Sequence, residues 1–185
     1  MSNSSESSNN IIVREINHDE NELLKQIYLL RVICRDFRGD ITLEKFPNGW
    51  KDELDEKSHH IGAIQDNMVI AAGRLTILQD IRDHPYFPAM QYFLPKQFCN
   101  FPIAYLSRDQ VHKEYRGLGL RSELLRRREQ MCMGEKVNNL FIDLEKSRST
   151  NFYNDGYREV GILDTSKIKW DIQETTYILM HKRLF

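Results

Sequence analysis

The chain has 185 residues, of which 26 are lysine or arginine and 27 are aspartate or glutamate, for a formal net charge of −1. This length suits one domain with a sizeable core, and the balanced charge argues against a general nucleic-acid-binding protein. No run approaches the roughly 18 apolar residues that a membrane span needs, and the N-terminus lacks the pattern of a secretory signal. We therefore expect a cytoplasmic protein with neither a nucleic-acid nor a membrane partner.

The cysteines and histidines do not indicate a metal site or a disulfide framework. Cys34, Cys99 and Cys132 are odd in number and form no C-x-x-C pair. His59 and His60 are adjacent, but neighbouring residues on a strand point to opposite faces and chelate poorly. The sequence therefore predicts no metal cofactor.

The chain divides into a short polar tail and one folded domain. Residues 1–10 are rich in serine and asparagine and almost free of apolar side chains, so we expect a disordered tail there. Residues 11–185 show no internal repeat and are expected to form a single domain.

The domain opens with a strand followed by helices. Residues 11–16 have the composition of a strand, and residues 17–20 supply capping residues for a helix over about 22–34. Residues 37–40 are expected to end that helix. A second, shorter helix is expected within residues 43–57, interrupted at a Pro-Asn-Gly sequence.

A hairpin and an aromatic segment follow. Residues 60–64 and 68–77 are expected to form an antiparallel pair around a turn at 65–67. Residues 79–102 then hold four prolines and six aromatic residues, a composition that regular structure does not explain easily. Because so many aromatic side chains are unfavourable in solvent, we expect this segment to fold over a neighbouring surface. Ordinary packing and a homodimer contact are both open.

The next stretch joins a strand over 104–111 to a helix that begins at Leu120, through Gly117 and Gly119. The first N–H groups of a helix lack partners and carry partial positive charge, and glycines let a phosphate approach such amides closely. We therefore expect a phosphorylated ligand here. The apolar face of the helix is expected at Leu120, Leu124, Leu125, Met131 and Cys132, with a basic opposite side at Arg126, Arg127 and Arg128.

This stretch resembles the central motif of the GNAT superfamily of N-acetyltransferases, which reads [Q/R]-x-x-G-x-[G/A] after a strand that ends near a valine. Arg116 and Gly119 match the motif, and Gly117 matches its frequent R-G-x-G form. Residues 111–115 resemble the common lead-in of the family. Arg121 stands where a glycine or alanine is usual; it either pairs with Glu123 at the surface or meets the phosphates of a ligand.

The resemblance continues downstream. Residues 139–145 are expected to form a strand parallel to the previous one, after a right-handed crossover. A short helix over 149–155, a strand over 157–161 and a last strand over 175–182 are expected next. Residues 151–161 are similar to the family pattern FYxxxGFxxvG, with one residue missing. The fold implied is α+β, the GNAT fold: a mixed, mostly antiparallel central sheet flanked by helices, with two parallel splayed central strands.

The resemblance also implies acetyl-CoA as co-substrate. Its pyrophosphate would lie over residues 116–122, and its pantetheine arm would lie between the splayed strands and bind main-chain groups. The cofactor-binding residues implied are Val111, His112, Arg116, Gly117, Leu118, Gly119, Leu120, Arg121, Ser122 and Asn151.

The implied reaction is direct attack of an amine on the thioester, which needs a base, donors for the oxyanion and an acid for the leaving thiolate. The candidate bases are Asp109, Glu145 and His112, and a chain of water molecules is an alternative. The candidate acid is Tyr153, with its neighbour Phe152 as the other residue that would face the thioester.

Three functions stay open. The first is transfer of an acetyl group to a primary amine of a small molecule or protein. The second is an N-acyl synthase with a longer acyl donor, whose acyl channel residues 79–102 would line. The resemblance also allows these residues to form a wall or lid of the acceptor pocket with either donor. The third is a domain that binds acyl-CoA without turnover. The sequence does not identify the acceptor.

Overall fold

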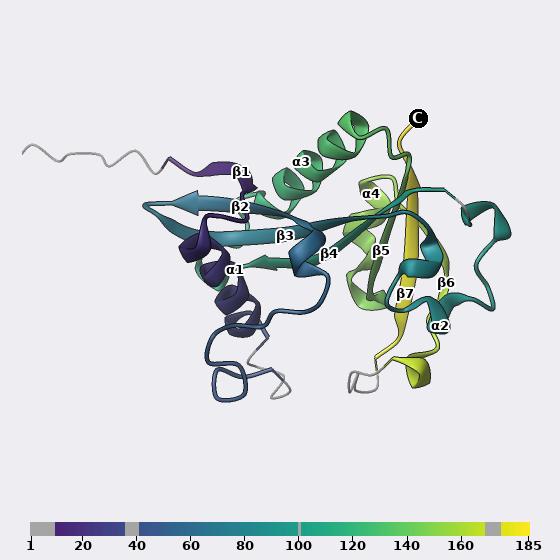
Figure 1. Ribbon diagram of the computed structural model, residues 1–185, viewed down its shortest axis with the longest axis horizontal. Coiled ribbons are helices and arrows are strands. Elements are labelled where there is room, and N and C mark those ends of the chain that lie inside the picture. The colour runs from purple at the N-terminus through teal and green to yellow at the C-terminus, as the bar shows by residue number, and fades with distance from the viewer. Residues whose placement is uncertain (1–9, 36–40, 100, 169–174) are drawn as a thin grey trace, which may run out of the picture.

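The computed structural model describes residues 10–35, 41–99, 101–168 and 175–185 (Figure 1). The predicted N-terminal tail lies, apart from its last residue, outside the described residues, and so does the predicted helix end at 37–40.

One mixed sheet of seven strands forms the centre of the molecule, in the order β1-β2-β3-β4-β5-β7-β6. Neighbouring strands are antiparallel except β4 and β5, which are parallel. The predicted α+β fold class is therefore confirmed. The strands are β1 (Ile12–Ile16), β2 (His59–Gln65), β3 (Met68–Leu78), β4 (Ile103–Val111), β5 (Asn139–Glu145), β6 (Arg158–Ile162) and β7 (Tyr177–Arg183), and the helices are α1 (Asn21–Ile33), α2 (Phe87–Met90), α3 (Leu120–Gly134) and α4 (Ser149–Asn154).

The β2–β3 hairpin follows its predicted pattern. Asp66 and Asn67 connect the strands with positive φ angles of 48° and 63°, the conformation that two-residue hairpin turns require. Met68 pairs directly with Gln65 across the turn.

The second helix predicted within 43–57 is wrong. This segment consists of turns and a single 3-10 turn at Asp55–Lys57. Gly49, at φ 88°, lies so close to α1 that a Cβ there would come within 2.5 Å of Tyr28. The following Trp50 is 3% exposed and packs on Val32. Contact with α1 therefore replaces local helix formation.

The sheet carries a core on each face (Figure 1). We call the side that packs on α1 the α1 face and the opposite side the α3 face. Leu24 and Ile27 of α1 pack on Ala72 of β3, whereas Leu124 of α3 packs in a separate core with Leu106 of β4.

The described part of residues 79–102 folds over β4, β5 and β7, in agreement with the expectation that it covers a neighbouring surface. These residues contain single 3-10 turns and the short α2, and they bury Met90 and Phe98 against Tyr105 and Phe141 on the α1 face. A Cβ on Gly161 of β6 would come within 2.5 Å of the ring of Phe93. The contact is close enough to require glycine.

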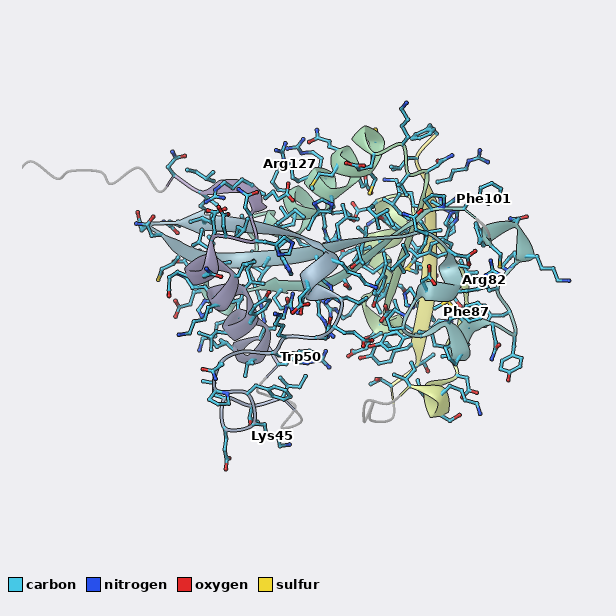
Figure 2. The ribbon with its side chains drawn as sticks, in the orientation of Figure 1. Lys45, Trp50, Arg82, Phe87, Phe101 and Arg127 are labelled. Carbon is cyan, nitrogen blue, oxygen red and sulfur yellow. The ribbon has the colours of Figure 1, made fainter. Side chains whose placement is uncertain are left out.

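The basic side predicted for α3 needs one correction. Arg126 and Arg127 are exposed, and Figure 2 shows Arg127 on the outer side of the helix. Arg128, however, is 0% exposed. It lies one turn beyond Leu124 and points into the sheet, where its Nη1 donates to the Arg74 carbonyl at 3.2 Å.

The parallel strands β4 and β5 separate part-way along their length. Their last pair is Leu106 with Ile142, although β4 continues to Val111 and β5 to Glu145. A bulge in β4 accompanies the separation, because Ala72 pairs with Gln110 whereas Arg74 pairs with Ser107. This leaves one edge of β4 free of strand partners.

Candidate active site

A cavity of about 360 Å³ opens where β4 and β5 separate. It extends from the last turn of α1 to the first turn of α3. Its lining residues are Cys34, Arg35, Asp109, Gln110, Val111, Arg116, Arg121, Leu124, Glu145, Arg148 and Tyr177. Five of the residues predicted from the sequence meet here: Asp109, Val111, Arg116, Arg121 and Glu145.

The glycine turn before α3 is held open. Gly117 and Gly119 have φ angles of 84° and 75°, a conformation that side chains disfavour. Apart from the chain neighbours, no heavy atom of the described residues would come within 4 Å of a Cβ on either glycine. Leu118 between them is 60% exposed, and Ser122 is exposed in the first turn of the helix. The first amides of α3 are therefore accessible to an anion.

The charges of the cavity favour an anion as well. Four arginines and two carboxylates line it. Arg121 donates from Nη2 to Asp155 at 2.6 Å, and its guanidinium lies 4.7 Å from the ring centre of Phe152. Its Nη1 is buried without a hydrogen-bond partner among the described residues. Of the two alternatives for Arg121, the pairing with Glu123 is wrong, since Glu123 pairs with Arg126.

The end of β4 presents main-chain groups to the cavity. The carbonyl of Val111 accepts long contacts from the Cys34 thiol at 3.6 Å and from Arg116 Nε at 3.4 Å. Burial raises the pKa of the Cys34 thiol, although Arg116 opposes the effect. The half-buried His112 donates its main-chain N–H to Ile70 at 2.9 Å and stacks edge-on against a tyrosine.

Asp109 serves α3. Its Oδ1 lies 2.7 Å from Nη2 of the buried Arg128, in an ion pair whose angles fall outside hydrogen-bond geometry. The pair crosses β3 at Gly73, where a Cβ would come within 2.7 Å of Oδ1. Two other arginines, Arg108 and Arg74, bind Asp52 and Asp55 instead of Asp109. Asp109 is thus the counter-ion of a buried cation.

Glu145 lies at the end of β5, where it is half-buried and lines the cavity. Its Oε1 accepts the hydroxyl of Tyr177 at 3.3 Å. The following residue, Lys146, directs its Nζ to Glu159 of β6, at 3.5 Å.

The residues of α4 do not line the cavity. Phe152 is buried against Tyr157, whereas Tyr153 is 38% exposed and donates its hydroxyl to Glu159 at 3.1 Å. Asn151 is exposed, and its carbonyl accepts the N–H of Asp155 at 3.2 Å. The structure therefore separates the buried residue of the aromatic pair from the one whose hydroxyl is accessible.

Sequence reasoning missed a chain of buried charges on the α1 face, which we call the ion chain. It runs through Arg31, Asp55, Arg74, Asp52 and Arg108. Asp55 accepts both Nη atoms of Arg31 at 2.8 Å and Arg74 at 2.9 Å. Asp52 joins Arg74 and Arg108, each at 2.5 Å. Arg31 and Asp55 are fully buried, and the exposed fraction of the side chain rises to 16% at Asp52 and 13% at Arg108.

The last member of the ion chain lies at the bulge of β4. Arg108 has φ 59° and stacks on Trp50, with 3.8 Å between its guanidinium carbon and the ring centre. Figure 2 places Trp50 below the sheet, on the side of α1. The ion chain therefore orients the strand segment that immediately follows the parallel pairs.

A second missed group is Asp143 of β5. It is half-buried and accepts the hydroxyl of Tyr105 at 2.6 Å. Burial raises its pKa, against the opposing effects of the Tyr105 hydrogen bond and the charge of Arg108. One signal in the sequence was available, because Asp143 interrupts the apolar run from Leu140 to Leu144.

Among the described residues, no three histidine, cysteine, aspartate or glutamate side chains gather in a way that would hold a metal ion. In the same part of the chain, every helix is too short or too polar to cross a membrane.

The comparisons with known proteins agree with the geometry. No protein-family model and no curated protein sequence matches this chain. Solved structures do. The chain is similar to BjaI, a CoA-dependent acyl-homoserine lactone synthase, with 17% identity, coverage of 95% of this chain and 84% of that chain, and a TM-score of 0.74. It is similar to FeeM, an N-acyl amino acid synthase from uncultured soil microbes, with 11% identity, coverage of 94% and 91%, and a TM-score of 0.70.

It is also similar to an acetyltransferase of the GNAT family from Staphylococcus aureus, with 17% identity, coverage of 95% of this chain and 100% of that chain, and a TM-score of 0.60. At these identities the likeness concerns the fold, and the chain has the GNAT fold that its central motif predicted.

Proposed function

We propose that the protein is an N-acyltransferase that moves an acyl group, with acetyl as the first donor to test, from a CoA thioester to a primary amine. One observation carries the proposal. The parallel strands separate beyond Leu106 and Ile142, and the gap opens into an arginine-rich cavity beside the glycine turn of α3.

The residues present fit CoA as co-substrate. The accessible amides after Gly119 suit a pyrophosphate, and the buried, unpartnered Nη1 of Arg121 offers a further donor. Arg116 and Arg148 add positive charge to the same cavity. The free edge of β4 offers main-chain groups to the pantetheine arm, in the manner of an added strand.

The chemistry follows from this placement. A neutral amine attacks the thioester carbonyl, a C–N bond forms, and the C–S bond then breaks to release CoA thiolate. Tyr153 is our proposed acid for that thiolate. Its hydroxyl now donates to Glu159, so it has to leave that carboxylate to act. Tyr153→Phe is expected to lower turnover on the order of 10²-fold at unchanged CoA affinity, and full activity would remove Tyr153 from the mechanism.

Two assays test the proposal. Calorimetry with acetyl-CoA measures binding, and release of free thiol from acetyl-CoA measures turnover across a panel of amines. The panel contains amino acids, spermidine and a hexapeptide with a free N-terminus, because the acceptor is either a small molecule or a protein. Thiol release that depends on an amine supports an acyltransferase. Binding without thiol release supports a domain that only binds acyl-CoA.

A second candidate is an N-acyl synthase that uses a longer donor. BjaI and FeeM superpose with higher TM-scores than the Staphylococcus aureus acetyltransferase, 0.74 and 0.70 against 0.60. Residues 79–102 also build an apolar core around Tyr105 and Phe141, close to the separation of β4 and β5. Rates of thiol release with acetyl-CoA, hexanoyl-CoA and decanoyl-CoA separate the two candidates, because an acetyltransferase favours the first donor.

A further inference from the structure

Asp143 occupies a special position in the sheet. It is the first residue of β5 after the last parallel pair, Leu106 with Ile142. Side chains alternate along a strand. Ile142 belongs to the core on the α3 face, so Asp143 points to the α1 face, on the same side as Phe141. Its carboxylate therefore stands where β4 and β5 begin to separate.

A CoA thioester would approach that point. The glycine turn holds the outer end of the cavity, and the free edge of β4 runs from Val111 back to Ser107. Four residue steps along a strand span about 13 Å. An acyl-pantetheine arm that lies along this edge brings its thioester toward the level of Asp143. The arrangement rests on the proposed function.

Tyr105 holds the carboxylate in place. It lies on β4, two residues before Ser107, and donates its hydroxyl to Asp143 Oδ1 at 2.6 Å. Tyr105 is 3% exposed and fixed by the His84 ring, whose centre lies 4.0 Å from its own. Burial, together with the neighbouring Asp143, raises the pKa of Tyr105 well above its ordinary value. The tyrosine therefore stays a hydrogen-bond donor.

We propose that Asp143 is the general base that takes the proton from the acceptor ammonium, with Tyr105 as its positioning residue. The proton moves from the ammonium nitrogen to the carboxylate and leaves a neutral amine. The nitrogen lone pair forms the C–N bond, the C–S bond breaks, and the electron pair leaves on CoA sulfur. The amide nitrogen loses its second proton as the thiolate is protonated, so one proton is released in the cycle.

The surroundings of Asp143 suit a base. Tyr105 and Arg108 face it from β4, Arg74 from β3, and Tyr86 from the segment before α2. Burial outweighs the two arginines and raises the pKa of the Asp143 carboxyl, which makes the carboxylate a stronger base than a surface aspartate. Burial raises the pKa of Tyr86 to about 12, so this neighbour is also a phenol at neutral pH.

The two carboxylates that line the cavity, Asp109 and Glu145, are engaged differently. Asp109 compensates the buried Arg128 on the side of α3. Glu145 lies two residues further out along β5, beside Tyr177. Asp143 is the carboxylate closest along β5 to the end of the parallel pairs.

The test compares Asp143→Asn with Asp83→Asn, the same change at an exposed position in the segment that covers the α1 face. Both variants are assayed for thiol release with acetyl-CoA and the fastest amine of the panel, from pH 5 to pH 10. Asp143→Asn is expected to lose 10²- to 10⁴-fold in rate at neutral pH, and the loss is expected to shrink as pH rises, because the acceptor then loses its proton to solvent. Asp83→Asn is expected to keep the wild-type rate.

A purely structural role of Asp143 predicts a loss of the same factor at every pH. That result, or a rate within twofold of wild type, would overturn the inference. Calorimetry with CoA shows whether the variant is folded. A wild-type protein that neither binds CoA nor releases thiol would refute the proposed function, and this inference with it. An active wild type beside a fully active Asp143→Asn refutes this inference alone.

Tyr105→Phe supplies a readout that needs no acceptor. The ¹³C carboxyl signal of Asp143 in the CoA-loaded protein is expected to titrate above the ordinary aspartate range of about 3.9. It is expected to titrate higher still in Tyr105→Phe, because the hydrogen bond that stabilises the carboxylate is lost. A midpoint at or below the ordinary range, or one that Tyr105→Phe does not move, would contradict the assignment.

Discussion

Two arginine-rich regions lie a short distance apart in this fold and treat their charges in opposite ways. In the ion chain, three arginines alternate with two aspartates, and Arg31 and Asp55 at its inner end are fully buried. Four arginines and two carboxylates line the cavity. One of the carboxylates, Asp109, pairs with Arg128, which is not a lining residue. Every charge of the ion chain is paired with another member, which leaves one positive charge in excess, whereas the lining of the cavity holds an excess of two.

The difference indicates what each region is for. Charges that are buried and paired fix the geometry of the elements that carry them, and removal of one partner is costly. An excess of accessible charge of one sign favours the binding of a ligand of the opposite sign. The ion chain ends at Arg108 on the bulge of β4, and the free edge of β4 continues to Val111 in the cavity. The ion chain therefore fixes the part of β4 whose continuation lines the cavity.

The largest effect is expected from breaking the ion chain at its centre. Asp55→Asn leaves Arg31 and Arg74 buried without their shared carboxylate, and is expected to lower the free energy of unfolding by about 3–5 kcal/mol. Urea denaturation measures it. Glu123→Gln is the matched control, because it breaks the exposed pair with Arg126 and is expected to cost at most about 1 kcal/mol. Equal losses in both variants would mean that the ion chain does not fix the fold.

Acid is expected to weaken the same region by a slightly smaller amount. His60 is 1% exposed beside Asp55, and burial lowers its pKa from 6.5 to about 4. Between these values the unfolded chain binds a proton that the folded chain does not, so stability falls as pH decreases from 7 to 4. The difference corresponds to roughly 2–3 kcal/mol.

The measurement compares urea denaturation of wild type and His60→Gln at both pH values. Glutamine can replace the hydrogen bond to the Asp55 carbonyl without taking up a proton. The wild type is expected to lose roughly 2–3 kcal/mol more than the variant. Parallel losses would show that His60 does not titrate in the folded state as its burial implies.

The sequence predicted those parts of the fold that have local signals. The β2–β3 hairpin has two largely apolar strands around Asp66 and Asn67, and β5 interrupts a polar region with an apolar run, so both were predicted closely. The start of α3 follows from the glycine turn. The helix predicted within 43–57 failed because packing of Gly49 and Trp50 on α1 overrides local propensity.

The groups that the sequence did not predict are joined over long separations. Arg31 and Asp55 are 24 residues apart, and Tyr105 and Asp143 are 38 apart. No periodicity connects such pairs. Arg128 illustrates the same limit, because its helical position looked exposed, whereas its counter-ion Asp109 lies on β4. Main-chain contributions from the glycine motif were predictable, and side-chain pairing across the sheet was not.

In the cavity, the largest effect on CoA binding is expected from Gly119→Val. A side chain at φ 75° is strained by roughly 1–2 kcal/mol, and it also covers the amides of the first turn. We expect the Kd for CoA to rise about tenfold or more by calorimetry. Gly134→Val is the control, because it lies at the other end of α3 with equally open space around its Cβ. Unchanged affinity in Gly119→Val would place the phosphates elsewhere.

A smaller effect is expected from Arg121→Ala. A hydrogen bond to a charged group contributes about 1.5–3 kcal/mol, but Arg121 already donates one Nη to Asp155, so we expect a rise in Kd of about tenfold, near the lower limit. The salt dependence of Kd is expected to fall with it, since the lost contact is electrostatic. Arg127→Ala, on the outer side of the same helix (Figure 2), is expected to leave both quantities unchanged.

A change at Asp155, the ion-pair partner of Arg121, is expected to shift Kd in the opposite direction. Asp155→Asn removes the charge that competes with a ligand for Arg121, and is expected to tighten CoA binding a few-fold. Two variants of one ion pair that shift Kd in opposite directions would assign the guanidinium to the ligand. If both variants instead lower stability and leave Kd and its salt dependence as in wild type, Arg121 serves only to join α3 to α4 through Asp155 and the Phe152 ring.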